Sequence, residues 1–366
     1  MEKLNVLIGP NGSGKSNFID AIGLLQATPH EYAAPIPAGD SVGNWVWRGE
    51  PMVKSAQIEV EVDNPKGYRA MRYRVVFAER GQTLDLIDER VENAESFPGY
   101  STPYIYFEMR GDKAILNYRD GKKRQLRPED IWPQWSILSQ RKNPRHYPEL
   151  AYLGESFSRI RLYREWSLGR NAPSRLPQKA DLPNDFLRED GKNLGLILNR
   201  FMREPEVKKR VLDALQKLYE GVSDFDIVIE GGTVQLLFHE GHITVPATRL
   251  SDGTLCYLYL LAILCHPKPP PLVCIENPEF GLHPDILPTL GDLLIEASKR
   301  CQLIVTTHSD VLLDALTETP ESVVVCEKRD GRTDMRRLNK EDLSDRLERY
   351  TLGELWCKGE IGGNRW

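Results

Sequence analysis

Residues 4–17 read LNVLIGPNGSGKSN, an apolar run that leads directly into a glycine-rich loop. Residues 4–8 have the composition of a buried β-strand, and residues 17–25 read as an apolar helix. Between them stands the pattern G-x-x-x-x-G-K-[ST], whose glycines let backbone N–H groups wrap a chain of phosphates. The loop residues are Gly9, Pro10, Asn11, Gly12, Ser13, Gly14, Lys15 and Ser16, and Asn17 opens the helix.

This loop predicts a site for a nucleoside triphosphate and Mg²⁺. Lys15 would reach the β and γ phosphates, and Ser16 would hold the metal ion. The helix beginning at Asn17 would direct its N-terminal N–H groups at the anion. A chance glycine-rich turn is the alternative, but strand, loop, Lys-Ser pair and helix all occur in the order that a phosphate site requires.

A second informative region lies far downstream. Residues 272–275, with the sequence LVCI, read as a central parallel strand that ends in Glu276, Asn277, Pro278 and Glu279. Acids at the carboxyl end of such a strand are placed to bind Mg²⁺. Residues 303–307 predict another buried strand that ends at His308, and residues 285–300 predict the helix between the two strands. Strand, helix and strand make a βαβ crossover.

A third motif, RLSDGT at residues 249–254, precedes a strongly apolar helix predicted at residues 255–265. Ser251, Asp252 and Gly253 would then lie at the helix N-terminus, where the first N–H groups lack intrahelical partners and can bind an anion. Taken alone, the motif is equally an ordinary N-cap. Its position between the phosphate loop and the acidic strand favours the anion site.

These motifs together resemble the ATP-binding-cassette (ABC) superfamily, in its soluble SMC, RecF and OLD-like branch, and most of all its AAA_21-like ATPases. The matching segments are the Walker A loop at 9–16, a signature-like stretch at 250–254, a Walker B strand ending at Glu276, the D-loop region at 278–284 and the switch His308. The resemblance implies an α/β fold, a P-loop NTPase of ABC-ATPase head type. It also implies ATP and Mg²⁺ as cofactors.

The resemblance further implies a homodimer in which each ATP lies between Walker A of one protomer and the signature of the other. Ser251 and Gly253 would then bring a second set of donors to the γ-phosphate. Gln140 is suggested as the glutamine that joins Mg²⁺ and the attacking water. Ser16, Gln140 and Glu276 would be the metal ligands.

Asn277 departs from the family pattern, in which two consecutive acids follow the Walker B strand. Glu276 keeps a carboxylate for the metal. An amide at Asn277 can orient a water molecule but cannot take its proton. Either hydrolysis is slow and the dimer stays closed, or another group such as Glu279 or His308 compensates. We expect a weak ATPase that acts as a switch, with a non-hydrolysing ATP-gated scaffold as the alternative.

The segment between the phosphate loop and the signature predicts two inserted lobes. We expect a split nucleotide-binding core at residues 1–55 and 222–340, an antiparallel β-lobe at 56–131, a helical insertion lobe at 132–221 and a C-terminal tail at 341–366. The β-lobe follows from period-two runs, and the helical lobe from apolar spacing interrupted by prolines. Expected elements are strands at 58–62, 73–77 and 104–107, helices at 194–202 and 207–219, and a hairpin at 227–238.

The 366 residues carry a formal net charge of −5, which hides an uneven distribution. Residues 101–210 contain 23 Lys and Arg against 14 Asp and Glu, a net charge of +9, while the rest of the chain carries −14. Basic clusters fall at 122–124, 141–145 and 159–164. They predict a phosphate-binding surface for DNA or RNA, or a dock for an acidic partner; a solvated face is the alternative.

Partners and location are expected from the same observations. No apolar run approaches the roughly 20 residues of a membrane span, and no signal-peptide pattern is present, so we expect a cytoplasmic protein with no membrane partner. The six cysteines form no C-x-x-C pair and read as buried free thiols. A separate nuclease or other effector in anti-phage defence is expected by family analogy, and a DNA repair or recombination clamp is the alternative. Trp45 and Trp47 are candidates to stack on adenine, but we favour a packing role for both.

Overall fold

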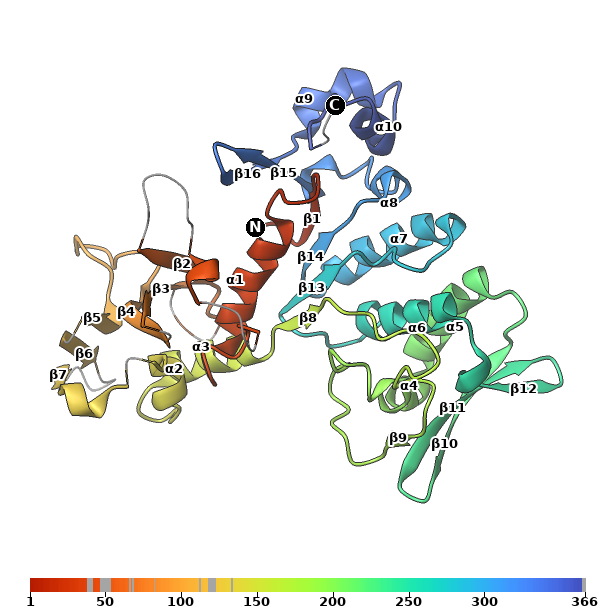
Figure 1. The fold of residues 1–366 in the computed structure, drawn as a ribbon, viewed down its shortest axis with the longest axis horizontal. Coiled ribbons are helices and arrows are strands. Elements are labelled where there is room, and N and C mark those ends of the chain that lie inside the picture. The colour runs from red at the N-terminus through yellow and green to blue at the C-terminus, as the bar shows by residue number, and fades with distance from the viewer. Residues whose placement is uncertain are drawn as a thin grey trace. The chain divides into compact units, whose positions relative to one another are not determined.

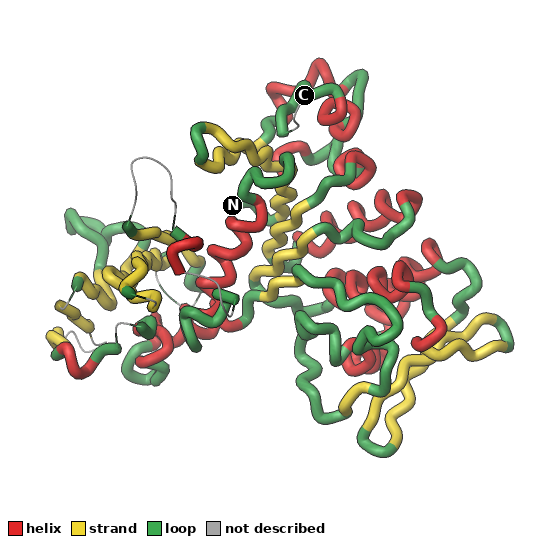
Figure 2. The backbone as a smooth tube through the Cα atoms, viewed as in Figure 1, coloured by secondary structure: helices red, strands yellow, loops and turns green. Residues whose placement is uncertain are grey.

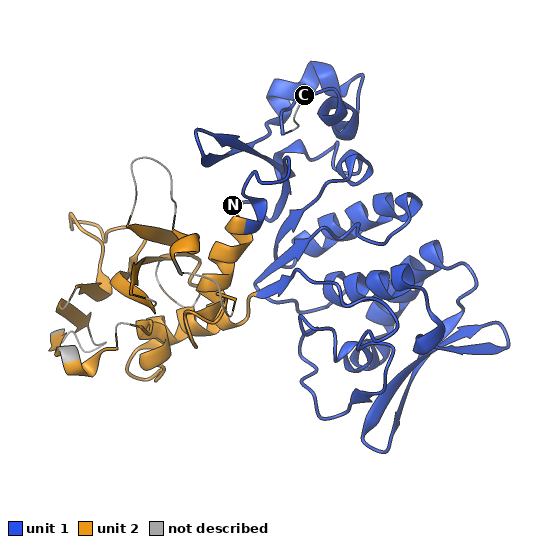
Figure 3. Cartoon of the chain, viewed as in Figure 1, with its two compact units in different colours: residues 1–16, 161–366 blue, residues 17–160 orange. Residues whose placement is uncertain are grey.

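The structure is a computed structural model that describes residues 1–37, 42–46, 54–65, 67, 69–81, 83–111, 113–117, 123–132 and 134–363. The chain forms two compact units, one of residues 1–16 with 161–366 and one of residues 17–160 (Figure 3). These units do not coincide with the lobes expected from the sequence. Strand β8 (Arg161–Tyr163), which falls within the expected helical insertion, pairs with the strand that ends at Glu276. Across the described ranges, no helix has the length and apolar character needed to cross a membrane.

The first unit is built on a six-stranded sheet in the order β16-β15-β1-β14-β13-β8 (Figure 1). All neighbouring strands are parallel except the antiparallel edge strand β16. Strand β1 is buried at every residue, as expected of a parallel strand covered on both faces. The remaining strands are β13 (Leu272–Glu276), β14 (Gln302–Thr306), β15 (Val323–Arg329) and β16 (Arg332–Arg337), with β1 at Leu4–Ile8.

Helices of the first unit accompany this sheet, and the backbone trace shows α6 and α7 lying alongside its strands (Figure 2). Helix α6 (Asp252–Leu264) is buried from Thr254 to Leu264, because it is apolar all round. The other helices are α4 (Leu194–Met202), α5 (Pro205–Leu218), α7 (Leu287–Ser298), α8 (Asp310–Asp314), α9 (Lys340–Leu347) and α10 (Leu352–Cys357). Short 3₁₀ turns are η3 (Ala247–Arg249), η4 (Pro284–Ile286) and η5 (Pro320–Ser322). The helices expected from periodicity are all present, with ends shifted by a few residues.

A small antiparallel sheet also belongs to the first unit. Its core is the predicted hairpin of β10 (Asp224–Glu230) and β11 (Thr233–Glu240), joined by Gly231 and Gly232. Both glycines have positive φ, 57° and 77°, which a tight hairpin turn requires. Strands β9 (Gln178–Lys179) and β12 (Ile243–Pro246) pair with β11.

The second unit contains the predicted antiparallel β-lobe, a meander whose six strands are hydrogen-bonded in chain order. Sequence reasoning missed β4 (Thr83–Asn93), because two register shifts along this strand interrupt its alternation of buried and exposed residues. The other strands are β2 (Ser55–Val62), β3 (Met71–Arg80), β5 (Ile105–Arg110), β6 (Lys113–Asn117) and β7 (Lys123–Leu126). The helical elements are α2 (Ile137–Gln140), α3 (Pro148–Ser158), η1 (Val42–Trp45), η2 (Pro128–Asp130) and the greater part of α1 (Lys15–Ala27).

The cysteines are free thiols, as expected, and all but one of them are buried. All six are free, and five are buried as small apolar side chains in the first unit. Cys357, at the end of α10, is exposed. Burial raises the pKa of Cys265 to about 12, so this thiol stays protonated at neutral pH.

Candidate functional site

The glycine-rich loop lies between β1 and α1, and its backbone conformation requires glycine. Gly9, Gly12 and Gly14 have φ values of 150°, 80° and 97°, a region that other residues avoid. A Cβ atom on Gly9 would collide with the carbonyl oxygen of Cys326 in β15, and one on Gly14 with the hydroxyl of Thr333 in β16. Strands β15 and β16 therefore bound the loop on one side.

Lys15 and Ser13 have the chemistry that a phosphate chain needs. The buried Lys15 side chain donates from Nζ to the carbonyl oxygens of Gly9 at 2.7 Å and Pro10 at 3.1 Å. Burial lowers the pKa of Lys15. The Ser13 hydroxyl is buried and has no hydrogen-bond partner in the described part of the chain. An amine across the loop and an unpaired buried hydroxyl fit a phosphate ligand, which would satisfy both groups.

The acidic strand places Glu276 in the sheet at the register position opposite Thr306 of β14. Its carboxylate accepts a hydrogen bond from Nε of Arg164 at 2.9 Å, and its main-chain oxygen accepts one from Trp166 Nε1 at 3.0 Å. The charge of Glu276 also acts on Lys15 and opposes the lowering of the Lys15 pKa by burial. An acid whose charge acts on Lys15 fits the metal-ligand role predicted for Glu276.

Asn277 has a structural reason to be an asparagine. Its φ is 47°, in the left-handed region, which asparagine enters more readily than most other residues. Its backbone N–H donates to the carbonyl oxygen of Thr306 at 3.0 Å, so the turn after β13 is tied to the neighbouring strand. A longer side chain at this position would have to accept the same backbone conformation.

Glu279 contacts the switch segment. Its Oε1 accepts hydrogen bonds from the Thr307 hydroxyl at 2.9 Å and from the backbone N–H of His308 at 2.8 Å. Its Oε2 is buried without a hydrogen-bond partner among the described residues. Burial, and then the charge of Lys15, lower the pKa of His308, which favours a neutral imidazole at neutral pH. The structure thus brings Glu279 and the backbone of His308 together, and the charge of Lys15 acts on His308.

The signature stretch forms the N-terminus of α6. Ser251 caps this helix, because its hydroxyl accepts a hydrogen bond from the backbone N–H of Thr254 at 3.0 Å. Asp252 accepts hydrogen bonds from Arg175 at 2.6 Å and from the Gly169 N–H at 2.9 Å. The bond from Arg175 holds the pKa of Asp252 below its usual range. Arg175, which is only 10% exposed, thereby fixes the signature loop to residues 169–175.

The signature also touches the D-loop region. A Cβ atom on Gly253 would lie 2.7 Å from the carbonyl oxygen of Gly281, and Cys256 Sγ donates to the carbonyl oxygen of Phe280 at 3.3 Å. The Phe280 side chain is 60% exposed. Close backbone approach therefore explains the glycine at 253.

Gln140 belongs to the second unit, at the end of α2. Its amide donates to the carbonyl oxygens of Trp135 at 2.7 Å and Trp132 at 3.3 Å, and its Oε1 accepts from the Trp132 N–H. Because Gln140 belongs to a different unit from Ser16 and Glu276, its place at the metal stays a prediction. Trp45 lies in η1, and Trp47 lies outside the described residues.

The basic residues expected on one insertion are divided between the two units. Arg141, Lys142, Arg145 and Arg159 belong to the second unit, whereas Arg161 and Arg164 belong to the first. Arg161 lies over the Phe186 ring and Arg164 binds Glu276. Lys122 lies outside the described residues. The described residues contain no group of three or more His, Cys, Asp or Glu arranged to hold a metal ion.

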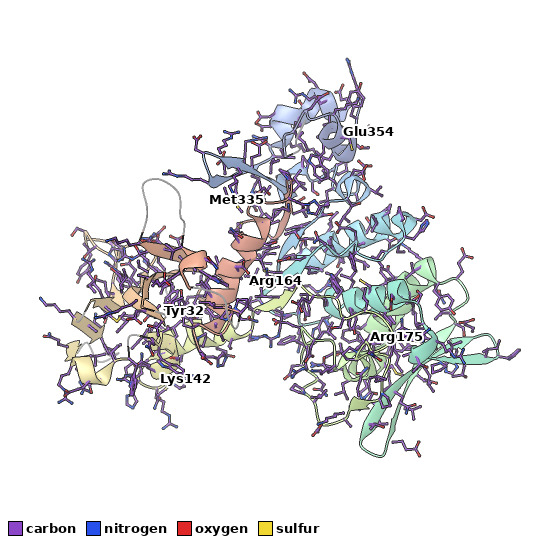
Figure 4. All side chains as sticks on the ribbon, in the orientation of Figure 1. Tyr32, Lys142, Arg164, Arg175, Met335 and Glu354 are labelled. Atoms are coloured by element: carbon purple, nitrogen blue, oxygen red, sulfur yellow. The ribbon has the colours of Figure 1, made fainter. Side chains whose placement is uncertain are left out.

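Sequence reasoning missed the residues that support the site. Arg164 and Arg175, labelled in Figure 4, contact Glu276 and Asp252. The last described residues border the phosphate loop as well, because Gly363 packs close to Gly9 and its N–H donates to Glu327 at 3.0 Å. Only the basic character of residues 159–164 hinted at Arg164, and no local signal marks Arg175 or Gly363.

The fold and these motifs define a P-loop ATPase head of the ABC type. Residues 4–314 match the AAA_21 family model, described as "AAA domain, putative AbiEii toxin, Type IV TA system", and the chain belongs to this family. The structure titled as the SmcHead bound to the C-winged helix domain of ScpA is similar at 17% identity, with a TM-score of 0.55 over 93% of both chains. The Smc head domain from Pyrococcus furiosus with an extended coiled coil, bound to the C-terminal domain of ScpA, is 14% identical, with a TM-score of 0.49 over 95% of this chain and 93% of that one. None of the curated proteins matches the sequence.

Proposed function

We propose that the protein is an ATP-driven switch that dimerises around Mg²⁺ and ATP, hydrolyses ATP slowly, and thereby controls a separate effector or a nucleic-acid-directed process. The observation that carries the proposal is that the first unit has two elements whose exposed backbone N–H groups are suited to an anion. One is the glycine-rich loop, and the other is the N-terminus of α6, where Ser251 is exposed. In a dimer, the second element would serve the nucleotide of the partner.

Each residue has a defined task in this proposal. The loop N–H groups and Lys15 bind the phosphates, while Ser16 and Glu276, together with Gln140, hold Mg²⁺. The metal ion would neutralise charge that develops on the phosphates. Asn277 orients the attacking water, and Glu279, already bound to the backbone of the switch, accepts its proton. Hydrolysis is slow because Asn277 cannot take the proton itself and Glu279 Oε1 already accepts two hydrogen bonds.

The effector is proposed from charge and family. The family description names a toxin and a toxin–antitoxin system, which supports a role in anti-phage defence with a separate nuclease or other effector. The basic residues of the second unit, Arg141, Lys142, Arg145 and Arg159, support contact with DNA or RNA. A DNA repair or recombination clamp is the competing role, and it requires DNA binding that ATP stimulates and salt weakens.

A non-hydrolysing scaffold is the second candidate function, and Asn277 is the observation that favours it. Single-turnover hydrolysis, measured beside the lifetime of the ATP-bound dimer, separates the two. A switch releases phosphate at the rate at which the dimer dissociates. A scaffold forms the dimer with ATP and releases no phosphate. A protein that stays monomeric with ATP and Mg²⁺ at micromolar concentration contradicts both candidates.

A further inference from the structure

Arg164 stands beside the metal-binding acid because of the sheet topology. Strand β8 runs parallel to β13, with Tyr163 opposite Ile275. Arg164 directly follows the last residue of β8, and Glu276 is the last residue of β13. The Arg164 guanidinium donates from Nε to Glu276 Oε1 at 2.9 Å. The Glu276 side chain is only 13% exposed and that of Arg164 34%, so solvent screens this ion pair less than a surface pair.

We infer that Arg164 is a positioning residue that holds the Glu276 carboxylate and sets how strongly nucleotide binding depends on Mg²⁺. This inference rests on the proposed function, since it concerns the same nucleotide site. It assigns a role to a residue that lies on neither the glycine-rich loop nor the acidic strand.

The physical argument starts from the charges around the carboxylate. Glu276 has the Arg164 guanidinium at hydrogen-bond distance and the Lys15 ammonium within electrostatic range. A guanidinium on one carboxylate oxygen partly neutralises the acid, so a metal ion meets less negative charge. The same positive charge favours the phosphates of a nucleotide that arrives without a metal. Arg164 therefore weakens the binding of a metal ion at Glu276 and strengthens the binding of metal-free nucleotide phosphates.

The longer side chain of Glu276 is a second reason why a partner such as Arg164 is needed to hold the carboxylate in place. A glutamate has one more rotatable bond than an aspartate, and an ion pair with a fixed partner restricts its rotamers. The backbone at this point is held separately, by the bond from Trp166 Nε1 to the Glu276 carbonyl oxygen. A change at Arg164 should therefore act on the side chain of Glu276 and leave its strand in place.

The test is the binding of a fluorescent ATP analogue to the full chain, first in EDTA and then during titration with Mg²⁺. For R164Q we expect the affinity for the analogue in EDTA to fall about tenfold. The Mg²⁺ concentration that gives half of the increase in binding should fall by a similar factor. R164K keeps the charge and should lie between R164Q and the wild type. R161Q, which changes the arginine at the start of β8, is the matched control and should behave as the wild type.

The experiment distinguishes failure of the inference about Arg164 from failure of the proposed function. Wild-type metal-free affinity and an unchanged Mg²⁺ midpoint in R164Q would overturn the inference and leave the proposed function intact. If R164Q does not fold, R164K decides, since an unaltered Mg²⁺ midpoint and metal-free affinity in that folded variant would overturn the inference equally. Failure of the wild type to bind the analogue at all would overturn the proposed function, and the inference with it.

Discussion

The Glu279 carboxylate accepts a hydrogen bond from the backbone N–H of His308 at 2.8 Å. This bond connects the segment after β13 with the segment after β14, and a second bond from the Thr307 hydroxyl reinforces it. The acid that follows Asn277 by two residues is therefore part of the switch itself. Any movement of His308 is coupled to the position of Glu279.

Glu279→Gln tests whether this acid takes the proton of the attacking water. The glutamine keeps an acceptor oxygen for His308, so the fold should persist, while turnover should fall about 100-fold. Phosphate release and melting temperature measure the two effects. Glu279→Ala also removes the acceptor and should destabilise the first unit by about 1–3 kcal/mol. A Gln variant with wild-type turnover would assign the proton to another group.

Asn277→Glu tests whether the amide is what makes hydrolysis slow. A carboxylate in the usual position should raise single-turnover hydrolysis about tenfold or more. It should also cost about 1 kcal/mol of stability, because the backbone at Asn277 has a φ of 47°. Asn277→Asp is the matched variant, since aspartate tolerates this backbone and adds a carboxylate on a shorter side chain. Unchanged rates in both variants would show that the amide does not limit hydrolysis.

Gly253→Ala tests the signature without changing the phosphate loop. The added Cβ would press on the Gly281 carbonyl oxygen at 2.7 Å and displace the signature from the D-loop region. ATP binding by the monomer should be unaffected, and the ATP-dependent dimer should weaken at least about tenfold. Gly241→Ala is the control, because a Cβ there meets nothing within 4 Å and only its φ of 57° is unfavourable. Equal dimerisation by the two variants would count against a signature contact.

Glu89 gives a prediction for the second unit. This buried carboxylate accepts hydrogen bonds from the Tyr73 hydroxyl at 2.8 Å, the Ser136 hydroxyl at 2.5 Å and the Ile137 N–H at 2.9 Å. Ser136 in turn caps α2, the helix that ends with Gln140. Removing the acceptor in Glu89→Ala should cost about 3 kcal/mol or more, because it leaves several buried donors unpaired.

The contribution of Glu89 to folding stability depends on pH, because burial raises the Glu89 pKa above its ordinary value of 4.5. A raised carboxyl pKa favours the protonated form in the folded state. Its contribution to stability is complete below pH 4.5 and is lost as the pH rises through the raised pKa. Glu89→Gln should therefore gain stability relative to the wild type as the pH rises above 4.5, measured by denaturant unfolding. A difference that does not change with pH would contradict the assignment.

Local sequence patterns were enough to predict those elements of the candidate site that are long or carry a motif. The strands ending at Ile8 and Glu276 and helix α6 are strongly apolar, and their motifs follow directly. Strand β8 could not be predicted, because three residues are too few to show a period. Arg175 could not be predicted either, since its partner Asp252 lies 77 residues away in the sequence. The residues proposed to bind the nucleotide are marked by motifs, whereas the residues that support them are positioned by tertiary contacts.

In the proposed dimer, each ATP lies between Lys15 of one protomer and Ser251 of the other. The most direct test mixes two labelled variants, Lys15→Ala and Ser251→Arg, and measures ATP-dependent energy transfer between protomers. Each variant alone lacks a complete site, whereas their heterodimer has one intact Lys15 facing one intact Ser251. We predict energy transfer with ATP in the mixture and none in either variant alone. No transfer in the mixture, or full transfer with Ser251→Arg alone, would contradict a nucleotide shared between Lys15 and Ser251.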